Sequence, residues 1–259
     1  MLDFLNNGLI ATLYPNGVTP TLFYIYYLLG ALLVIAVGYL LGSINSSIII
    51  SKFLYRDDIR RHGSGNAGAT NMLRTYGKKA ALLTLLGDVM KTVLSVLFAA
   101  IIFGFNYVGG ISTGGGFCYI AGLFTILGHI FPLYYGFKGG KGVLATAAMA
   151  LVLSPVAFLI LITVFILIVW MSKYVSLGSV TVAILYPVVL HGIFQVQFGM
   201  TMPGLTALSA IIAAIVIVWC HRHNLERISN RTENKISFKK KAPVATDAEK
   251  CTDNANDEE

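Results

Sequence analysis

Long apolar stretches alternate with short polar segments along the chain up to about residue 220. The first of them, residues 22–50, is long enough to cross the roughly 30 Å hydrocarbon core of a bilayer as a helix. The pattern predicts an all-α polytopic membrane protein, built as a bundle of seven helices. The predicted spans cover residues 22–50, 80–104, 116–131, 143–154, 157–172, 175–197 and 205–220.

The stretch from 143 to 172 has two interpretations. Ser154 and Pro155 lie near its middle, where a proline marks either the tip of a hairpin or a kink in one helix. Each arm of a hairpin would be short for a full crossing. A single crossing, however, would put the basic C-terminal segment outside. We favour the hairpin, because Lys141 and Lys173 then lie on one side of the membrane.

Apart from Lys91, which lies inside the second span, basic residues fall in alternate gaps between the apolar stretches. Of the 19 Lys and Arg residues, seven lie between Lys52 and Lys79 and eight between Arg222 and Lys250. The segments that contain none are 1–20, 105–115 and 192–204. Because cytoplasmic loops are enriched in Lys and Arg, this alternation predicts an N-terminus outside and a C-terminus in the cytoplasm.

The composition excludes a large soluble domain. Hydrophobic residues make up 56% of the chain and charged residues only 12%, against roughly 25% charged in soluble proteins. The net charge of +7 follows from the membrane topology, and it carries no nucleic-acid signature. Three scattered cysteines provide neither a disulfide framework nor metal-ligand spacing.

We therefore expect a single integral membrane domain over residues 1–233 and a polar tail over 234–259. The tail has the composition of a disordered cytoplasmic segment. Its lysine cluster, Lys239 to Lys241, could contact anionic lipid. A plain solvated tail is an equal alternative.

The most unusual polar segment is the run from Gly63 to Asn71, Gly-Ser-Gly-Asn-Ala-Gly-Ala-Thr-Asn. Its glycines allow tight turns and leave backbone N–H groups unobstructed, and its short polar side chains add hydrogen bonds. Such a loop suits an oxyanion, most simply a phosphate. The candidate binding residues in or beside it are Ser64, Asn66, Gly68, Thr70, Asn71 and Arg74.

A second polar segment places Lys138 and Lys141 on either side of two glycines. Two point charges beside an approachable backbone suit a phosphate monoester, although the segment does not match the Walker P-loop pattern. A positive-inside anchor with a flexible turn explains it equally well.

A third polar segment follows the last span and contains His221 and Asn224. A histidine at the membrane–water boundary can transfer protons near neutral pH; an interfacial histidine among snorkelling arginines is the alternative. Ser176 and Ser179, at the start of the sixth span, could donate to an anion or cap the helix.

Asp88 and Lys91 are three residues apart within an apolar span, so they share a helix face. Intramembrane charges face a polar interior or each other. We favour a structural, self-neutralising pair over a pair lining the site; a third alternative places both at the membrane surface. The small residues from Gly42 to Ser47 indicate close helix packing.

The three polar segments together resemble a known family. The run from Gly63 to Asn71 with Arg74 resembles the first signature of the bacterial acyl-phosphate:glycerol-3-phosphate acyltransferases. The second signature is matched by Gly128-His-Ile-Phe-Pro132 with Phe137-Lys-Gly-Gly-Lys-Gly142. The third is similar to His221-x-x-Asn224-Leu-x-Arg227 with Glu233.

The chain departs from the family pattern in four places, one of which is a longer tail. The family usually has Arg where this chain has Cys220, and a glycine where it has Arg231. The segment 191–204 is longer than expected. These departures concern the local geometry of the third signature.

The resemblance implies a reaction in which acyl phosphate acylates the 1-hydroxyl of glycerol-3-phosphate, giving lysophosphatidate and phosphate without a metal or organic cofactor. Our hypothesis for this reaction is that the glycine loop cradles the leaving phosphate through Ser64, Asn66, Gly68, Thr70 and Asn71. The residues expected to hold glycerol-3-phosphate are Arg74, Lys141, His221 and Asn224, with Ser176 or Ser179 assisting and Lys138 less certain. The proton acceptor is either His221 or the phosphate of the donor.

The partners so implied are acyl phosphate, glycerol-3-phosphate and membrane lipid, and the enzyme that makes acyl phosphate is a further candidate. The location implied is the bacterial inner membrane, with the site facing the cytoplasm. A transporter for an organophosphate is the main alternative. It should show inverted repeats, and the chain has no second copy of the glycine loop. A purely structural or regulatory membrane protein would leave the three polar segments unexplained.

Overall fold

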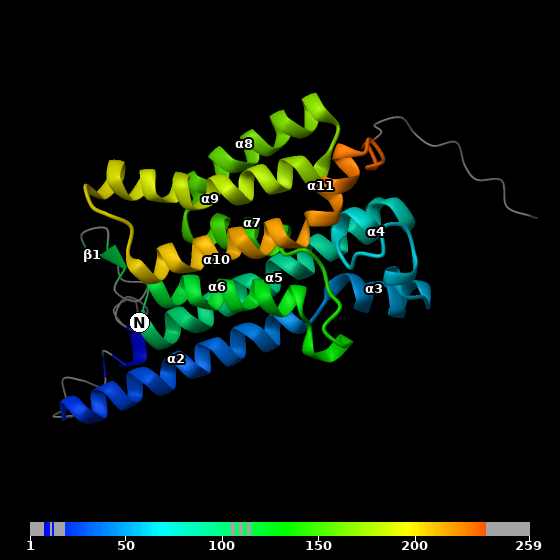
Figure 1. The fold of residues 1–259 in the computed structure, drawn as a ribbon. Helices are drawn as coiled ribbons and strands as arrows, with labels where there is room; N and C mark the ends of the chain where they lie inside the picture. Colours follow the sequence, from blue (N-terminus) through cyan, green and yellow to red (C-terminus); the bar gives the residue numbers. More distant parts are fainter. Residues whose placement is uncertain are drawn as a thin grey trace, which may run out of the picture.

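The computed structural model describes residues 8–10, 12, 19–104, 107–108, 111–112 and 115–236, which form a bundle of helices (Figure 1). The longer helices are α2 (Pro20–Ser43), α5 (Lys78–Phe103), α6 (Gly115–Ile130), α8 (Pro155–Ser172), α9 (Val175–Phe198) and α10 (Gly204–Cys220). The shorter helices are α3 (Ser46–Tyr55), α4 (Ala69–Thr75), α7 (Val143–Leu153) and α11 (Arg222–Ser229), and single 3-10 turns cover Ile59–Arg61 and Leu133–Tyr135. Strands β1 (Tyr107–Val108) and β2 (Ile111–Ser112) pair antiparallel.

Local sequence sets where the helices begin. The side chain of Thr19 caps α2 by accepting from a backbone N–H, and Asn45 caps α3 in the same way. Pro155 opens α8, at a position where the N–H that proline lacks would have no helical partner. The predicted span 22–50 is therefore two helices, separated at Ile44 and Asn45.

The segments α7 and α8 form a hairpin around Ser154. Lys141, just before α7, donates to Asn224, and Asn224 donates to Ser176 in the first turn of α9. The start of α7 and the end of α8 therefore lie at the same end of the bundle (Figure 1), and the hairpin prediction is confirmed. With 11 residues, α7 is about 16 Å long, roughly half of a hydrocarbon core.

The helices are those of a multi-pass membrane protein, as predicted. Five helical segments are long and apolar enough to cross a membrane. The pair α10 and α11, bent by 50°, makes a sixth if it is one span. Because α7 is too short to be counted with them, the seventh crossing stays a prediction.

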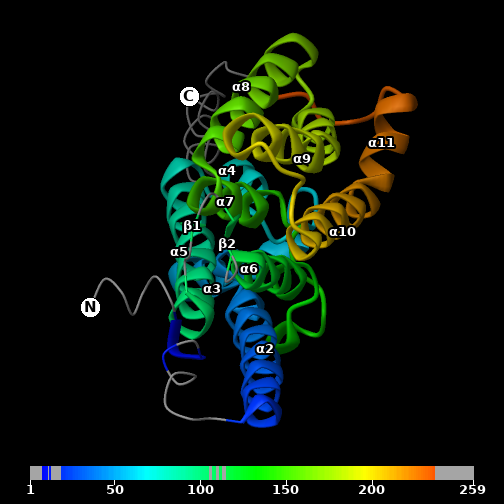
Figure 2. The same cartoon turned by 90° about the vertical axis from the view of Figure 1, so that its left-hand side faces the viewer.

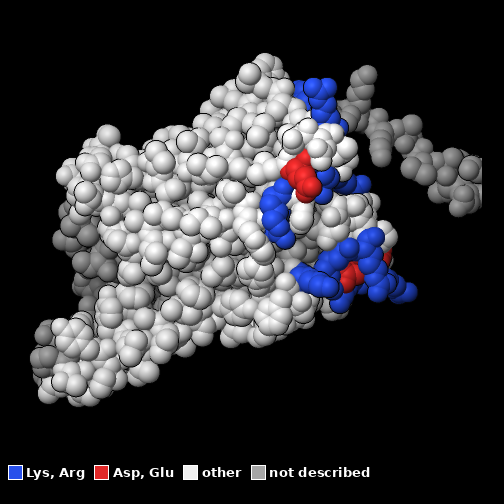
Figure 3. All heavy atoms as spheres, viewed as in Figure 1, with Lys and Arg blue, Asp and Glu red and all other residues white. Residues whose placement is uncertain are grey.

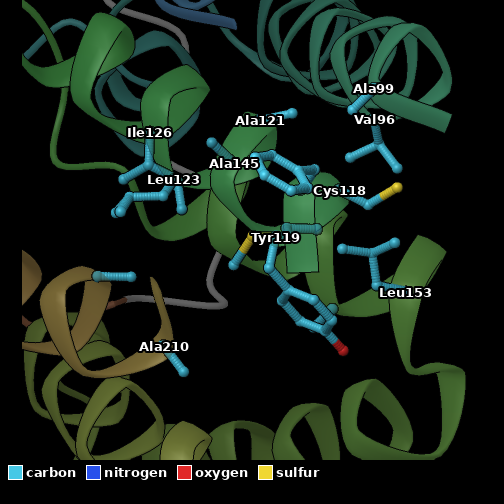
Figure 4. Close-up of a cluster of buried hydrophobic side chains, with 14 of the residues drawn as sticks. Val96, Ala99, Cys118, Tyr119, Ala121, Leu123, Ile126, Ala145, Leu153 and Ala210 are labelled. Carbon is cyan, nitrogen blue, oxygen red and sulfur yellow. The ribbon is translucent and has the colours of Figure 1, made fainter. Parts of the chain in front are cut away.

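The centre of the bundle is α6, which packs against α2, α5, α7 and α10 (Figure 2). Side chains of α6 and its neighbours, among them Cys118, Ile126 and Ala145, form the buried core (Figure 4). A Cβ at Gly42 of α2 would collide with the carbonyl oxygen of Thr125 in α6. The close packing expected of this small-residue segment is confirmed.

Charged residues gather at one end of the bundle. The Lys, Arg, Asp and Glu side chains visible in Figure 3 lie at the end that carries α3, α4 and α11. The β1–β2 hairpin lies at the opposite end (Figure 1). This is the sidedness that the alternating basic gaps predict. The tail predicted for residues 234–259 lies outside the described residues beyond residue 236.

Candidate active site

The glycine-rich loop folds around the side chain of Asn71. Its amide nitrogen donates to three backbone carbonyls of the loop and the preceding turn, at 2.9–3.2 Å. Its amide oxygen accepts from the N–H of Ser64 at 3.0 Å. Gly63 and Gly65 have φ values of 58° and 70°, a region that glycine enters without strain. The buried Asn71 side chain is therefore fully occupied in shaping the loop.

Gly140 joins the second polar segment to the glycine loop. Its N–H donates to the carbonyl of His129 at 3.0 Å. A Cβ at this position would collide with the His129 ring and would lie 2.7 Å from the carbonyl oxygen of Ala67. Because glycine alone fits this gap, the segment runs directly past the loop and holds Lys141 close to it.

The third segment meets the second at Asn224. Lys141 donates to the Asn224 oxygen, and the Asn224 nitrogen donates to Ser176 at 2.9 Å and to Glu233 at 2.6 Å. Ser176 and Arg227 also donate to Glu233, at 2.6 and 2.8 Å. Burial acts to raise the pKa of Glu233, but these hydrogen bonds hold its pKa below the usual value. The ionised carboxylate thereby fixes the orientation of the Asn224 amide.

His221 lies at the bend between α10 and α11. Its Nδ1 is 2.8 Å from the carbonyl oxygen of Ile217. A carbonyl oxygen can only accept, so Nδ1 carries the proton and Nε2 of the neutral ring is an acceptor. The fold thus presents a histidine in a defined tautomer beside the network of Asn224.

These segments surround one cavity of about 430 Å³. The site residues predicted from the sequence that line it are Ser64, Asn66, Gly68, Thr70, Asn71, Arg74, Lys141, Ser176, Ser179, His221 and Asn224. Lys138 lies elsewhere, in a shallow depression beside Asp58, Arg60 and Tyr135. The structure therefore brings the predicted residues together with this one exception.

The inner part of the same cavity is apolar. Its walls come from α7, α8 and α9, through Leu144, Ala147, Ala150, Phe158, Leu161, Ile162, Phe165, Val182 and Ala183. A polar mouth that continues into an apolar interior is the shape that an amphiphile requires.

Two cations at the mouth have no carboxylate partner. Neither Arg74 nor Lys141 forms a salt bridge with any residue that the structure describes. Lys141 donates one hydrogen bond, to the neutral amide of Asn224, and keeps two N–H donors. Burial lowers the pKa of Lys141 to about 8. Over the described ranges no three His, Cys, Asp or Glu side chains are placed to hold a metal ion, whereas the mouth suits an anion.

Asp88, Lys91 and His129 form a second polar network behind the cavity. Lys91 Nζ is 2.9 Å from Asp88 and 3.0 Å from His129 Nδ1. It also donates to the carbonyls of Gly42 and Ile44 at 3.1 and 3.0 Å. Asp88 and Lys91 are no more than 5% exposed, so both are buried inside the bundle. Asp88 and His129 line the cavity, as expected of a pair that lines the site. Their network also joins α2, α5 and α6, as expected of a structural pair.

Sequence reasoning placed Arg227 and Glu233 in the third signature but assigned them no role. Arg227 follows Asn224 by three residues, and this helical spacing was the available signal. Glu233 comes after α11 has ended, and only the fold returns it to Asn224. Tyr186, deep in the cavity wall, carries no local signal because it stands within an apolar helix.

Known proteins match this chain over most of its length. Residues 32–231 match the family model described as glycerol-3-phosphate acyltransferase. The glycerol-3-phosphate acyltransferase of Mycoplasmopsis agalactiae is 39% identical, over 83% of this chain and 98% of its own. That of Syntrophomonas wolfei is 41% identical, over 81% of this chain and 97% of its own.

Solved structures agree with these sequence matches. The crystal structure of an integral membrane glycerol 3-phosphate acyltransferase in its glycerol 3-phosphate form has a TM-score of 0.68 at 32% identity, covering 80% of this chain and 96% of that one. The lysophosphatidic acid form has a TM-score of 0.66 at 31% identity, covering 80% and 95%. This chain therefore belongs to the glycerol-3-phosphate acyltransferase family.

Proposed function

We propose that this protein transfers a fatty acyl group from acyl phosphate to the 1-hydroxyl of glycerol-3-phosphate, giving lysophosphatidate and inorganic phosphate. The observation that carries the proposal is one cavity in which two cations without carboxylate partners, Arg74 and Lys141, open onto an apolar interior. Two reactants that both bear phosphate, one of them with a fatty chain, match this combination. Solved relatives in glycerol 3-phosphate and lysophosphatidic acid forms support the acceptor and the product.

The chemistry of the acyl donor explains why the site has to position the two reactants and does not need a nucleophilic side chain. An acyl phosphate is a mixed anhydride and is already activated, so no covalent enzyme intermediate is required. The hydroxyl oxygen forms the new ester bond while the bond between the carbonyl carbon and the phosphate oxygen breaks. Catalysis then depends on holding both reactants and on stabilising the charge of the leaving phosphate.

We assign the leaving phosphate to the glycine loop. Ser64, Asn66 and Thr70 line the cavity from this loop, and Gly68 permits close approach of the backbone there. Asn71 acts by keeping the loop in shape, because all of its hydrogen-bonding groups are engaged within it.

We assign glycerol-3-phosphate to Arg74 and the Lys141–Asn224 pair. The two free N–H donors of Lys141 and the guanidinium of Arg74 suit the phosphate dianion. Ser176 donates to Glu233 and so orients Asn224. Ser179 donates to a carbonyl of its own helix, so its oxygen can only accept.

Two groups can receive the proton of the 1-hydroxyl, His221 Nε2 and the leaving phosphate. Replacing His221 with Ala separates them. If His221 is the acceptor, the chemical step at saturating substrates falls by about 10²–10⁴-fold. A single-turnover rate close to that of the unchanged protein assigns the proton to the phosphate.

We further propose that the charged end of the bundle faces the cytoplasm of a bacterium, across its inner membrane. Seven crossings, with α7 counted as the seventh beside the five long apolar segments and the α10–α11 pair, then place the N-terminus outside. The basic residues gathered at this end support the orientation (Figure 3). Accessibility of a C-terminal tag from outside intact cells would contradict it.

The test is to mix the purified protein with palmitoyl phosphate and glycerol-3-phosphate and to measure lysophosphatidate and phosphate. We expect both products in equal amounts. The Lys141→Ala variant should lose most of this activity, and the matched change at an exposed lysine of the same end, Lys79→Ala, should not. If no lysophosphatidate forms, the proposal is wrong; flux of glycerol-3-phosphate into vesicles would indicate a transporter instead.

A further inference from the structure

The apolar part of the cavity has a defined inner end. On α9 the lining begins at the mouth with Val175 and Ser176 and ends at Tyr186. Ten residues of helix separate Ser176 from Tyr186, which is about 15 Å. On α7 the lining ends at Ala150, and on α8 its deepest member is Phe158. Ala150, Phe158 and Tyr186 are thus the lining residues furthest from the mouth on α7, α8 and α9, and these three helices lie next to one another (Figure 1).

Tyr186 is the largest fully buried side chain of the described residues, at 1% exposure. Its hydroxyl has no hydrogen-bond partner among them. Burying an unpaired hydroxyl destabilises a protein, and a phenylalanine would fill the same space without this penalty. Packing, rather than a hydrogen bond, therefore holds the ring in place at the end of the cavity.

We infer that the Tyr186 ring limits the length of the acyl chain that the cavity accepts. The inference rests on the proposed function, because it assigns the apolar part of the cavity to the fatty chain of the donor. A chain anchored by its phosphate in the glycine loop, beside Ser64, Asn66 and Thr70, extends inward along α9 until its last carbon meets the ring. Further methylene groups have no apolar space and must fold back or remain outside.

This stop has a measurable signature. Each methylene group that enters the cavity should raise affinity about fourfold, as expected for burial of a CH₂ group. Beyond the length at which the chain reaches Tyr186, a further methylene group should no longer raise affinity. We call this length the break, and a change at Tyr186 should shift it.

The experiment measures binding of a series of saturated alkyl phosphates to the purified full-length protein and to three variants. Alkyl phosphates carry the phosphate and the chain but cannot transfer an acyl group, so the readout does not require turnover. Tyr186→Ala removes the ring, and Tyr186→Phe removes only the hydroxyl. Leu190→Ala is the matched control, a buried residue one turn further along α9 that does not line the cavity.

We expect Tyr186→Ala to move the break to chains longer by about two or more methylene groups, because the truncated side chain leaves space that a ligand can fill. Tyr186→Phe should keep the original break and raise the melting temperature. Leu190→Ala should lower the melting temperature and keep the break. The inference is wrong if Tyr186→Ala keeps the break, if Tyr186→Phe moves it as far, or if no alkyl phosphate binds.

Measuring turnover with acyl phosphates of the same lengths distinguishes a failure of this inference from a failure of the proposed function. A protein that binds alkyl phosphates with the expected break but makes no lysophosphatidate contradicts the reaction alone. A protein that makes lysophosphatidate with the same length profile in the unchanged and Tyr186→Ala forms contradicts the inference alone.

Discussion

Two lysines in this bundle lie in polar networks with opposite surroundings. Lys91 has four acceptors for its three protons: Asp88, His129 and the carbonyls of Gly42 and Ile44. Lys141 has a single neutral acceptor, the amide oxygen of Asn224. The first ammonium group is saturated by the protein, whereas the second keeps donors that face a cavity.

The number of acceptors around each ammonium group distinguishes a structural lysine from a binding lysine more clearly than burial does. Both lysines are withdrawn from water, but the donors of Lys91 are all engaged by groups of the protein, which joins α2, α5 and α6. A charge with spare donors and no carboxylate requires an anion from outside to be satisfied. We therefore expect changes at Lys91 to reduce stability and changes at Lys141 to reduce activity.

The largest expected effect is that of Lys91→Met. Removing one partner of a buried ion pair leaves the Asp88 carboxylate uncompensated and costs about 3–5 kcal/mol. Thermal unfolding in detergent should show a large fall in melting temperature, with Lys79→Met as the exposed control. Adding Asp88→Asn to Lys91→Met should recover part of the loss. A normal melting temperature with lost activity would instead place Lys91 in the binding site.

Lys141→Met should reduce activity and leave stability nearly unchanged. Loss of one charged donor at a reacting phosphate reduces the rate by about 10²–10³-fold, while the melting temperature stays close to that of the unchanged protein. Steady-state kinetics with glycerol-3-phosphate and thermal unfolding of the same preparation provide both values. A fall in melting temperature as large as that of Lys91→Met would remove the distinction between the two lysines.

Gly140→Ala tests whether the two networks are mechanically linked. The added methyl group would push against the His129 ring on one side and the Ala67 carbonyl on the other. We expect a cost of about 1–3 kcal/mol from overpacking together with reduced activity, because the loop and Lys141 must shift. The matched control is Gly192→Ala, where no atom lies within 4 Å of the added carbon. Full activity of Gly140→Ala would show that the loop tolerates displacement from His129.

Sequence reasoning reached the helices and most of the polar residues that line the cavity, because both depend on local signals. The apolar stretches, the glycine loop and the paired lysines can be recognised within a few residues, and the sidedness of the basic residues favoured the hairpin at Ser154. Interactions between distant segments could not be reached. The side chain of Asn71 looks like a ligand in the sequence but turns inward to its own loop. The role of the Glu233 carboxylate is evident only in the fold, where the chain returns to Asn224 and the Asn224 amide donates to it.

The smallest expected effect is a pH dependence of activity that follows the charge of the Lys141 ammonium group. Because burial lowers the pKa of Lys141 to about 8, its ammonium is charged below that pH and neutral above it. The phosphate of glycerol-3-phosphate is a dianion above its second pKa of about 6, so the substrate does not change charge there. kcat/KM for glycerol-3-phosphate should therefore fall above pH 8, approaching about tenfold per pH unit. Lys141→Arg should keep its charge and lose this decline; the same decline in this variant would assign the titration to another group.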